Sequence, residues 1–193
     1  MHVRELIEKH YPEYYGWYDY PADRTVAFCK ADGEWGILGN FGQTPLVVDG
    51  VPFHSAEVLF QVMKFSDPGA RKAVYAQKGQ HAKMTAKHFE KTVGPRADWG
   101  EILIDALKFC IMNKYVQSEA FRSELARTDD RFIVEVQSNH KKPADSYCAK
   151  LSPDGKTWSG PNLMGRLLME LRDKGKLEYD LPEDAMRFKD LLD

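Results

Sequence analysis

The chain has 193 residues, of which 43% are hydrophobic and 29% are charged, and its formal net charge is −2. This composition fits one globular domain with a sizeable core, and the small net charge gives no overall attraction to nucleic acid or anionic membranes. Three cysteines without a C-x-x-C pair argue against a disulfide framework and favour a reducing compartment. No run approaches the ~18 apolar residues of a membrane span, and no apolar leader is visible, so we expect a cytoplasmic protein.

The first part of the chain predicts short elements. Residues 4–10 predict a helix, residues 25–30 a strand, and residues 31–43 a glycine-rich loop. Asp49-Gly50 lies between two apolar runs and predicts a β-hairpin. Ser55 is a suitable N-cap for the helix that follows.

The rest of the chain predicts mostly helices. Asp98 and Glu101 have the spacing of a capping box at the start of a long helix. We also expect a strand, a long polar loop after it, and a last helix in the acidic tail. The expected helices cover 68–77, 79–93, 99–115, 118–128 and 162–175, the strand 131–136 and the loop 137–161. The fold class is therefore α+β, mainly α-helical, with a small β-sheet in a single domain.

The helix after Ser55 carries one narrow polar stripe. At ~100° per residue, Glu57, Gln61 and Lys64 fall within a sector of about 60°, and apolar side chains occupy nearly all other directions. Such a helix is largely buried, with its stripe facing something specific. One interpretation is an internal salt bridge from Glu57 to Lys64 with Gln61 as a bridge. The other is a catalytic carboxylate whose pKa is raised by burial and lowered by Lys64.

Two other patterns have an ordinary interpretation and a functional one. "GILGNF" could cradle a phosphate, but it lacks the established nucleotide-loop spacings, so a turn is favoured. Lys83, Lys87 and Lys91 form a stripe at helical spacing, and residues 60–122 hold 11 Lys and Arg against 6 Asp and Glu. A solvated face is favoured over contact with nucleic acid. No metal-ligand spacing and no G-x-S-x-G occur, so we predict no metal and no serine or cysteine nucleophile.

Several segments occur in the order found in one known family. They are "GNF" at 39–41, "SAEVLFQVMKF" at 55–65, Trp99, "IVE" at 133–135 with Asp145, and "NLMGRLLMELR" at 162–172. With these segments the chain resembles the NADAR family, also called YbiA-like N-glycosidases, over nearly all of residues 25–172. The resemblance implies a domain over 25–175, an N-terminal extension over 1–24 and an acidic helical tail over 176–193.

The resemblance implies hydrolysis of an N-glycosidic bond at C1 of an ADP-linked or 5′-phosphorylated ribose, without a cofactor. The first substrate class is ADP-ribose on guanine bases of DNA, whose removal reverses DarT-type modification and would make the protein an antitoxin. The second is the ribosylaminopyrimidine phosphates of riboflavin biosynthesis. A non-catalytic module that binds ADP-ribose or NAD is a third reading. The expected partner is thus ADP-ribosylated nucleic acid or a small ribosyl phosphate, with no membrane and an oligomeric state left open.

The resemblance also assigns roles to residues. Glu57 would stabilise an oxocarbenium-like transition state and take a proton from water, with Asp145 as the acid for the leaving group. Gln61 and Lys64 would hold phosphate, ribose hydroxyls or Glu57 itself. Asn162 is expected to cap the next helix and turn its N–H groups toward phosphate. The other implied substrate-binding residues are Asn40 and Phe41 at the ribose or base, Trp99 as a stacking wall, Phe28, Glu135 and Gly165.

One segment departs from the family pattern. Where the family has D-x-x-W-G, this chain reads "DSYCA", so Cys148 and Ala149 replace Trp and Gly. Either Trp158 fills the space of the missing indole, or the leaving-group side is more open. An open side would suit a bulky nucleic acid better than a small pyrimidine.

Overall fold

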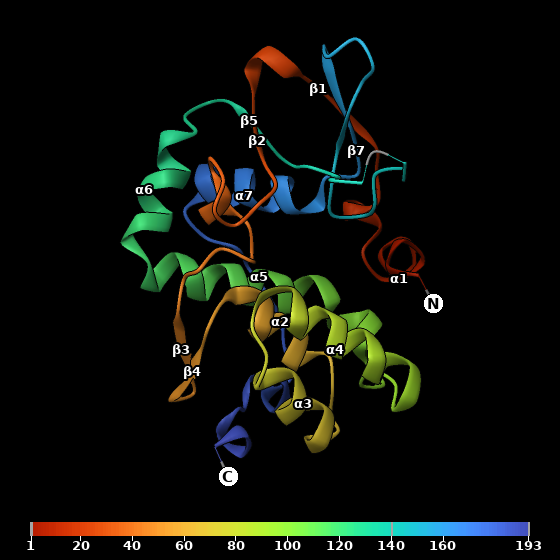
Figure 1. Ribbon diagram of the computed structural model, residues 1–193, viewed down its shortest axis with the longest axis vertical. Coiled ribbons are helices and arrows are strands. Elements are labelled where there is room, and N and C mark those ends of the chain that lie inside the picture. The colour runs from red at the N-terminus through yellow and green to blue at the C-terminus, as the bar shows by residue number, and fades with distance from the viewer. Residues whose placement is uncertain (1, 140, 193) are drawn as a thin grey trace. The chain divides into compact units, whose positions relative to one another are not determined.

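The computed structural model describes residues 2–139 and 141–192. The chain forms two compact units, each built from two segments (Figure 1). Unit 1 comprises Met1–Gly39 and Ala120–Leu177, and unit 2 comprises Asn40–Glu119 and Glu178–Asp193. The α+β class with mainly helical content is confirmed. Instead of one sheet, the described residues form three small sheets.

Unit 1 is organised around a two-stranded parallel sheet. Strand β2 (Thr25–Phe28) pairs with β5 (Phe132–Glu135), and α7 (Leu163–Lys174) packs against β5 (Figure 1). The helix approaches the strand closely because Gly165 has no side chain: a Cβ there would lie 2.0 Å from the Ile133 carbonyl oxygen. Ile133 and Val134 are consecutive in β5 and point to opposite faces, and both are fully buried, so the strand is covered on both faces, as is usual for a parallel pair.

The second sheet of unit 1 corrects the prediction of a long loop. The polar segment after β5 contains β6 (Lys150–Leu151) and β7 (Thr157–Gly160), which join β1 (Tyr18–Pro21) in the antiparallel order β1-β7-β6. These strands are short and polar, so their alternation is weak, and pairing with a distant aromatic strand decides their conformation. Trp158 lies opposite Tyr20 in β1 and packs on the cluster of Tyr20, Val134 and Ala149.

The glycine-rich loop forms a turn rather than an anion cradle. It contains the 3₁₀ turn Gly36–Leu38, and the backbone N–H groups of Gly36 and Gly39 donate to the loop's own carbonyls at 2.9 and 3.1 Å. A Cβ on Gly36 would lie 2.2 Å from the Lys30 carbonyl oxygen, so the loop closes on itself through this glycine. The predicted turn is therefore favoured over phosphate binding at these N–H groups.

Unit 1 also contains two helices that the sequence predicts. One is α1 (Val3–His10), and the other is α6 (Glu119–Arg127), whose first residue, Glu119, is assigned to unit 2. The N-terminal extension packs on α7: the Arg166 guanidinium lies 4.3 Å from the Tyr18 ring and donates to the Tyr14 carbonyl oxygen at 3.0 Å. The extension is thus an integral part of unit 1.

Unit 2 surrounds the helix with the polar stripe. Figure 1 shows α2 (Ala56–Met63) among α3 (Pro68–Tyr75), α4 (Gly79–Thr92) and α5 (Trp99–Gln117), and α2 packs against all three. All eight residues of α2 are buried. The N-cap is confirmed, because the Ser55 hydroxyl accepts a hydrogen bond from the Val58 N–H.

The hairpin of unit 2 is also confirmed. Strands β3 (Leu46–Val48) and β4 (Val51–Phe53) pair with Val48 opposite Val51. Asp49 and Gly50 both have positive φ, 52° and 77°, as a two-residue turn between twisted strands requires. The turn also presents the Asp49 side chain, which accepts a hydrogen bond from the Phe188 N–H at 2.9 Å.

Two predictions in unit 2 are wrong. Asp98 makes no cap hydrogen bond, because its carboxylate binds the Arg96 guanidinium instead. The tail forms 3₁₀ turns at Glu183–Met186 and Lys189–Leu191 rather than a helix, since tertiary anchors hold a segment too short to propagate a helix. No helix of the described residues is long and apolar enough to cross a membrane.

Candidate active site

The polar stripe of α2 forms a continuous chain of hydrogen bonds. The Gln61 Nε2 donates to Glu57 Oε1 at 2.9 Å, and the Lys64 Nζ donates to Gln61 Oε1 at 3.0 Å. Only 6% of Glu57 and 3% of Gln61 is exposed. Gln61 therefore bridges the acid and the ammonium, as the internal-bridge interpretation predicted. The carboxylate and ammonium are linked through the amide.

Helix α4 presents a second charged pair with the same seven-residue spacing. Lys83 and Glu90 lie on one face of α4, as do Glu57 of α2 and Lys64, the C-cap of that helix. The Lys64 Nζ lies 2.5 Å from Glu90 Oε1. Lys83 exerts the largest attraction of any charge on Glu57. Lys64, at the end of α2, is thus neutralised by Glu90 of α4, and Lys83 of α4 attracts Glu57 of α2.

Burial raises the pKa of Glu57. The positive charge of Lys83, the Gln61 hydrogen bond and the charge of Lys64 each lower the pKa and oppose that rise. A carboxylate in such surroundings binds a proton more readily than an exposed glutamate, and the nearby cations still favour its ionised form. This is the balance required of a general base.

The Cys110 thiol lies in the same interior, with its Sγ 3.7 Å from Met63 Sδ. Burial and the neighbouring Glu57 raise the pKa of this thiol well above its usual range. The thiolate is the nucleophilic form of cysteine. A raised pKa makes Cys110 a poor nucleophile, because less of the thiolate is present.

Two buried polar side-chain atoms in the segment that leads to α2 lack a partner among the described residues. The Glu57 backbone N–H donates to the Asn40 carbonyl oxygen at 3.0 Å, which places the Asn40 backbone at the first turn of α2. Among the described residues, neither the Asn40 Oδ1 nor the Thr44 Oγ1 has a hydrogen-bond partner, although only 7% and 6% of these residues is exposed. An unmet buried polar group costs about 1–3 kcal/mol. Both atoms are suited to a ligand with hydroxyl or N–H groups.

Two aromatic rings flank this arrangement. The Phe41 ring lies 5.5 Å from the Lys83 Nζ. Trp99, 5% exposed, packs on Phe60 with ring centroids 5.4 Å apart and lies 5.7 Å from the Lys64 Nζ. Trp99 is thus largely enclosed. Its geometry fits a wall behind the ammonium better than an open platform for a base.

The predicted residues of unit 1 gather around the start of α7. Asn162 is fully buried, its Nδ2 donates to the Ile133 carbonyl oxygen at 2.8 Å, and its Oδ1 accepts the Glu135 N–H at 3.2 Å. The predicted cap is wrong, since this side chain makes no cap hydrogen bond and binds β5 instead. Phe28 is buried in β2, and Gly165 permits the contact of α7 with β5. These positions hold unit 1 together, and their role in binding stays a prediction.

Asp145 is an exposed residue between β5 and β6. Its Oδ1 accepts a hydrogen bond from the Tyr147 N–H at 3.0 Å. Cys148, in the position of the family's Trp, is 9% exposed, and its carbonyl oxygen accepts the Asn162 N–H. The role of Asp145 as an acid stays a prediction. Within the described ranges, no group of three His, Cys, Asp or Glu side chains is arranged to hold a metal ion.

Residue patterns alone do not reveal two residues of this candidate site, Glu90 and Thr44. Lys83 is exposed, as the predicted solvated stripe requires, and its ammonium also lies 5.5 Å from the Phe41 ring and is the charge that attracts Glu57 most. Glu90 was not singled out, although its seven-residue spacing from Lys83 repeats that of Glu57 and Lys64 and could have indicated it. Thr44 carries no sequence signal of its own, because an unpaired hydroxyl is visible only in the fold.

Comparison with known proteins identifies the family. A family model described as the NADAR domain matches residues 27–175, which is most of the chain. The chain belongs to the NADAR domain family. The segments that suggested this resemblance include the α2 stripe of unit 2 and the start of α7 in unit 1, so the family pattern covers both units.

Similar proteins carry names that concern N-glycosides and riboflavin. N-glycosidase YbiA of Escherichia coli K12 is 27% identical over 81% of this chain and 91% of its own length. Riboflavin biosynthesis protein VVA0006 of Vibrio vulnificus is 26% identical over 87% of this chain, which spans only 42% of that protein. The NMR structure of E. coli YbiA matches with a TM-score of 0.60 and 26% identity, over 79% of this chain and 84% of that one. The family and these names support N-glycosidase activity in general terms.

Proposed function

We propose that this protein is an N-glycosidase that hydrolyses the C1–N bond of an ADP-ribosyl or 5′-phosphoribosyl group. The observation that carries the proposal is the buried Glu57 carboxylate, together with two buried acceptors in the segment that leads to α2, Asn40 Oδ1 and Thr44 Oγ1, which have no partner among the described residues. A ribose offers hydroxyl donors of the kind that these acceptors lack. The raised pKa of Glu57 suits a base that must take and release one proton during each turnover.

In the proposed reaction, water attacks C1 of the ribose. Its oxygen bonds to C1 while the C1–N bond breaks and its electron pair leaves with the nitrogen. Ionised Glu57 stabilises the positive charge that develops on the sugar and accepts the proton of the water. That proton then passes to the leaving nitrogen, so Glu57 returns to its starting state. Gln61 holds the carboxylate in place through its 2.9 Å hydrogen bond.

We assign the substrate's phosphate to Lys83. Lys64 is already paired with Glu90, whereas Lys83 is exposed and forms no ion pair with a described residue. Its Nζ also lies 5.5 Å from the Phe41 ring, and its charge lowers the pKa of Glu57 more than any other charge does. An exposed ammonium retains its affinity for a dianion, while one in an ion pair must first give up its partner.

For the complete substrate we propose ADP-ribose attached to guanine in DNA. Lys87 and Lys91 continue from Lys83 along α4, and both are exposed, so they could contact a nucleic-acid backbone. The second candidate is a ribosylaminopyrimidine phosphate, because one relative is named a riboflavin biosynthesis protein. Both substrates present a C1–N bond and phosphate to the same residues of unit 2.

The deciding experiment gives the purified protein both substrates under identical conditions. One is an oligonucleotide with ADP-ribosylated guanine, and the other is a ribosylaminopyrimidine phosphate. We expect release of ADP-ribose from the oligonucleotide, lost in Glu57→Gln and retained in Glu119→Gln, an exposed control on α6. Cleavage of the pyrimidine compound alone would move the assignment to the second candidate. Binding of ADP-ribose with cleavage of neither compound would favour the non-catalytic module.

The contribution of DNA is tested with a lysine pair. Lys87→Ala with Lys91→Ala should reduce activity on the oligonucleotide several-fold at low salt, and less at high salt, because fewer counterions are released. Activity on an ADP-ribosylated mononucleoside should not change. Equal loss on both substrates would contradict a backbone contact.

A further inference from the structure

The C-terminal segment Glu178–Asp193 is part of unit 2, although it lies outside the residues that match the family model. Phe188 anchors it. This ring is fully buried, lies 5.2 Å from the Phe53 ring and 5.5 Å from the Arg71 guanidinium, and its N–H donates to Asp49. The segment is thus attached to the hairpin and to α3.

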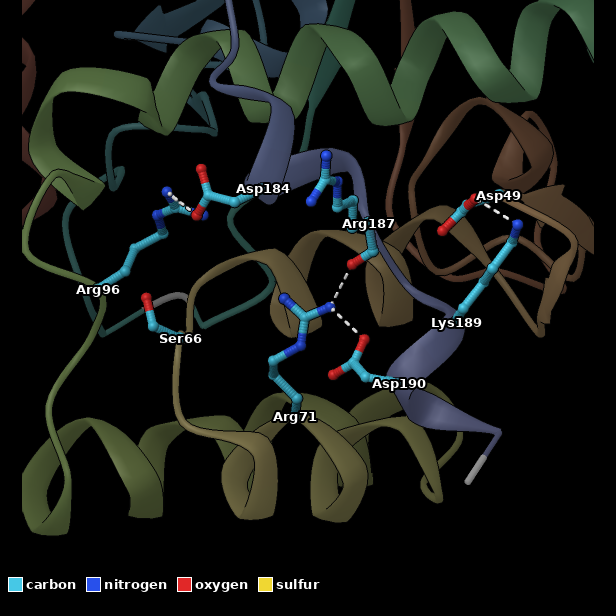
Figure 2. Close-up of a pocket in the computed structure, with 8 residues that line it drawn as sticks. All are labelled: Asp49, Ser66, Arg71, Arg96, Asp184, Arg187, Lys189 and Asp190. Atoms are coloured by element: carbon cyan, nitrogen blue, oxygen red, sulfur yellow. Dashed lines mark hydrogen bonds and ion pairs between the residues drawn. The ribbon is translucent and has the colours of Figure 1, made fainter.

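Next to this anchor, unit 2 has a pocket of about 490 Å³ whose walls are mostly charged. Figure 2 shows its eight residues, with the side chains of the C-terminal segment facing those of the rest of the unit. The ion pairs across the pocket are Arg71–Asp190 at 3.2 Å, Arg96–Asp184 at 3.0 Å and Lys189–Asp49 at 3.8 Å. Because its cations are already paired with carboxylates, the pocket is better explained as a contact that holds the C-terminal segment in place than as a free anion site. We call these three ion pairs the clasp.

One of these pairs connects the clasp to the candidate active site. Arg96 is 7% exposed, and its guanidinium is held from two sides, by Asp98 at 2.5 and 2.9 Å and by Asp184 at 3.0 Å. Its backbone N–H donates to the Lys64 carbonyl oxygen at 2.9 Å, and its carbonyl oxygen accepts the Trp99 N–H at 3.1 Å. Residue 96 therefore holds the end of α2 and the start of α5 together.

We propose that Arg96 is a positioning residue for the candidate active site, and that Asp184 of the C-terminal segment completes its clamp. The inference rests on the proposed function, since Lys64 and Trp99 matter to it as part of the Glu57 site. Arg96 acts through the backbone: a fixed guanidinium fixes the turn before α5, which fixes the Lys64 carbonyl and the Trp99 ring. Lys64 in turn orients Gln61 and, through it, Glu57.

The test compares two carboxylates of the same pocket. Asp184→Asn removes one of the two carboxylates that hold Arg96 and leaves Asp98 in place. Asp190→Asn removes the carboxylate that pairs with Arg71, a residue without a hydrogen bond to Lys64 or Trp99 in the network above. Since small misplacements in an active site can lower rates by up to about 10²-fold, we expect Asp184→Asn to lower kcat/KM by about 3–10-fold. Asp190→Asn should leave kcat/KM within about twofold while it lowers thermal stability to a similar extent.

Arg96→Lys and Arg96→Gln extend the test. Lysine keeps the charge but cannot bind Asp98 and Asp184 in the same forked geometry, so both variants should lose more activity than Asp184→Asn, and lysine should lose less than glutamine. Equal kinetic losses in Asp184→Asn and Asp190→Asn, at equal loss of stability, would overturn the proposal, because the clasp would then act only through folding.

A readout without substrate separates this inference from the proposed function. The Trp99 indole N–H signal in NMR spectra, assigned with Trp99→Phe, should shift or broaden in Asp184→Asn and stay in place in Asp190→Asn. If the wild-type protein cleaves neither substrate but this difference appears, the proposed function fails and the positioning of Trp99 stands. If Asp184→Asn leaves the Trp99 signal unchanged, the positioning role is wrong, whatever the activity.

Discussion

The two segments that carry the strongest family resemblance differ in what their polar residues do. In unit 1, the Asn162 side chain forms hydrogen bonds with the backbone of β5, and Gly165 permits the close contact of α7 with the Ile133 carbonyl oxygen. In unit 2, Glu57 is equally buried but its pKa is raised, and its neighbour Asn40 has an unpaired oxygen. The first segment is explained by packing, and the second has polar atoms that packing leaves unexplained.

This contrast teaches how to divide a family pattern into structure and function. A buried polar side chain with all its bonds made stabilises the fold, and its removal is expected to affect stability first. A buried carboxylate held at a raised pKa destabilises the fold at neutral pH and needs another reason to be there. The predictions below test this division.

The largest expected effect belongs to the packing segment. Gly165→Ala would place a Cβ 2.0 Å from the Ile133 carbonyl oxygen, so α7 must move away from β5. We expect a loss of about 3 kcal/mol or more in the free energy of unfolding, measured with urea. Gly33→Ala, whose Cβ would meet the Lys30 carbonyl oxygen at 3.4 Å, is the control and should stay close to wild type. Unchanged stability with a raised KM would instead place Gly165 at the substrate.

Glu57→Gln should lose activity without losing stability, the opposite of Gly165→Ala. We expect kcat to fall by at least about 10²-fold, the scale of losing a base and its charge. Thermal stability at neutral pH should rise, because ionised Glu57 is disfavoured by burial.

The pH dependence of that gain follows from the raised pKa. Below the pKa of glutamate in the unfolded chain, Glu57 is protonated in both states, so the variant should gain little. The gain should grow as pH rises to the higher pKa of the folded state and stay constant above it. Melting temperatures at acidic and neutral pH measure this. A gain that is the same at both would show that ionisation of Glu57 does not oppose folding.

The pH–rate profile tests the role of Lys83. If Glu57 is the base, kcat rises with pH as this carboxyl ionises. Lys83→Met removes the charge that lowers the pKa of Glu57 most, so the rise should move to higher pH, and the rate below it should fall several-fold. Lys72→Met, at an exposed position on α3, should leave the profile in place. A profile that Lys83→Met does not move would remove Lys83 from the site.

The smallest effect is expected at Lys64. Because Glu90 already neutralises this ammonium, Lys64→Ala should raise KM by less than about tenfold. The lost hydrogen bond to Gln61 should lower kcat by about 3–10-fold, comparable with Asp184→Asn. Lys83→Ala should raise KM more than Lys64→Ala does, if the phosphate binds at Lys83. A larger effect of Lys64→Ala on KM, in kinetics of the folded fraction, would return the phosphate to the α2 stripe.

The sequence alone determined the local features of this protein. The periodicity of residues 55–65 predicted a buried helix with one polar stripe, Ser55 predicted its start, and Asp49-Gly50 predicted the hairpin. Each of these depends on neighbours within a few residues, since the helical and strand periods and the demands of a two-residue turn are local. For the same reason Glu57 could be selected before any fold was known.

The tertiary structure decided which partners these residues have. Lys64 meets Glu90, Asp98 meets Arg96 rather than a helix N-terminus, and the Asn162 side chain binds β5. The strands β6 and β7 form because β1 offers them a partner from the other end of the chain. A polar side chain satisfies the acceptor or charge that packing brings within about 3 Å, and that neighbour is set by contacts distant in sequence. The family resemblance could supply the order of the motifs. Only the fold shows that the Asn162 side chain is hydrogen-bonded to β5, whereas the Asn40 Oδ1 has no partner among the described residues.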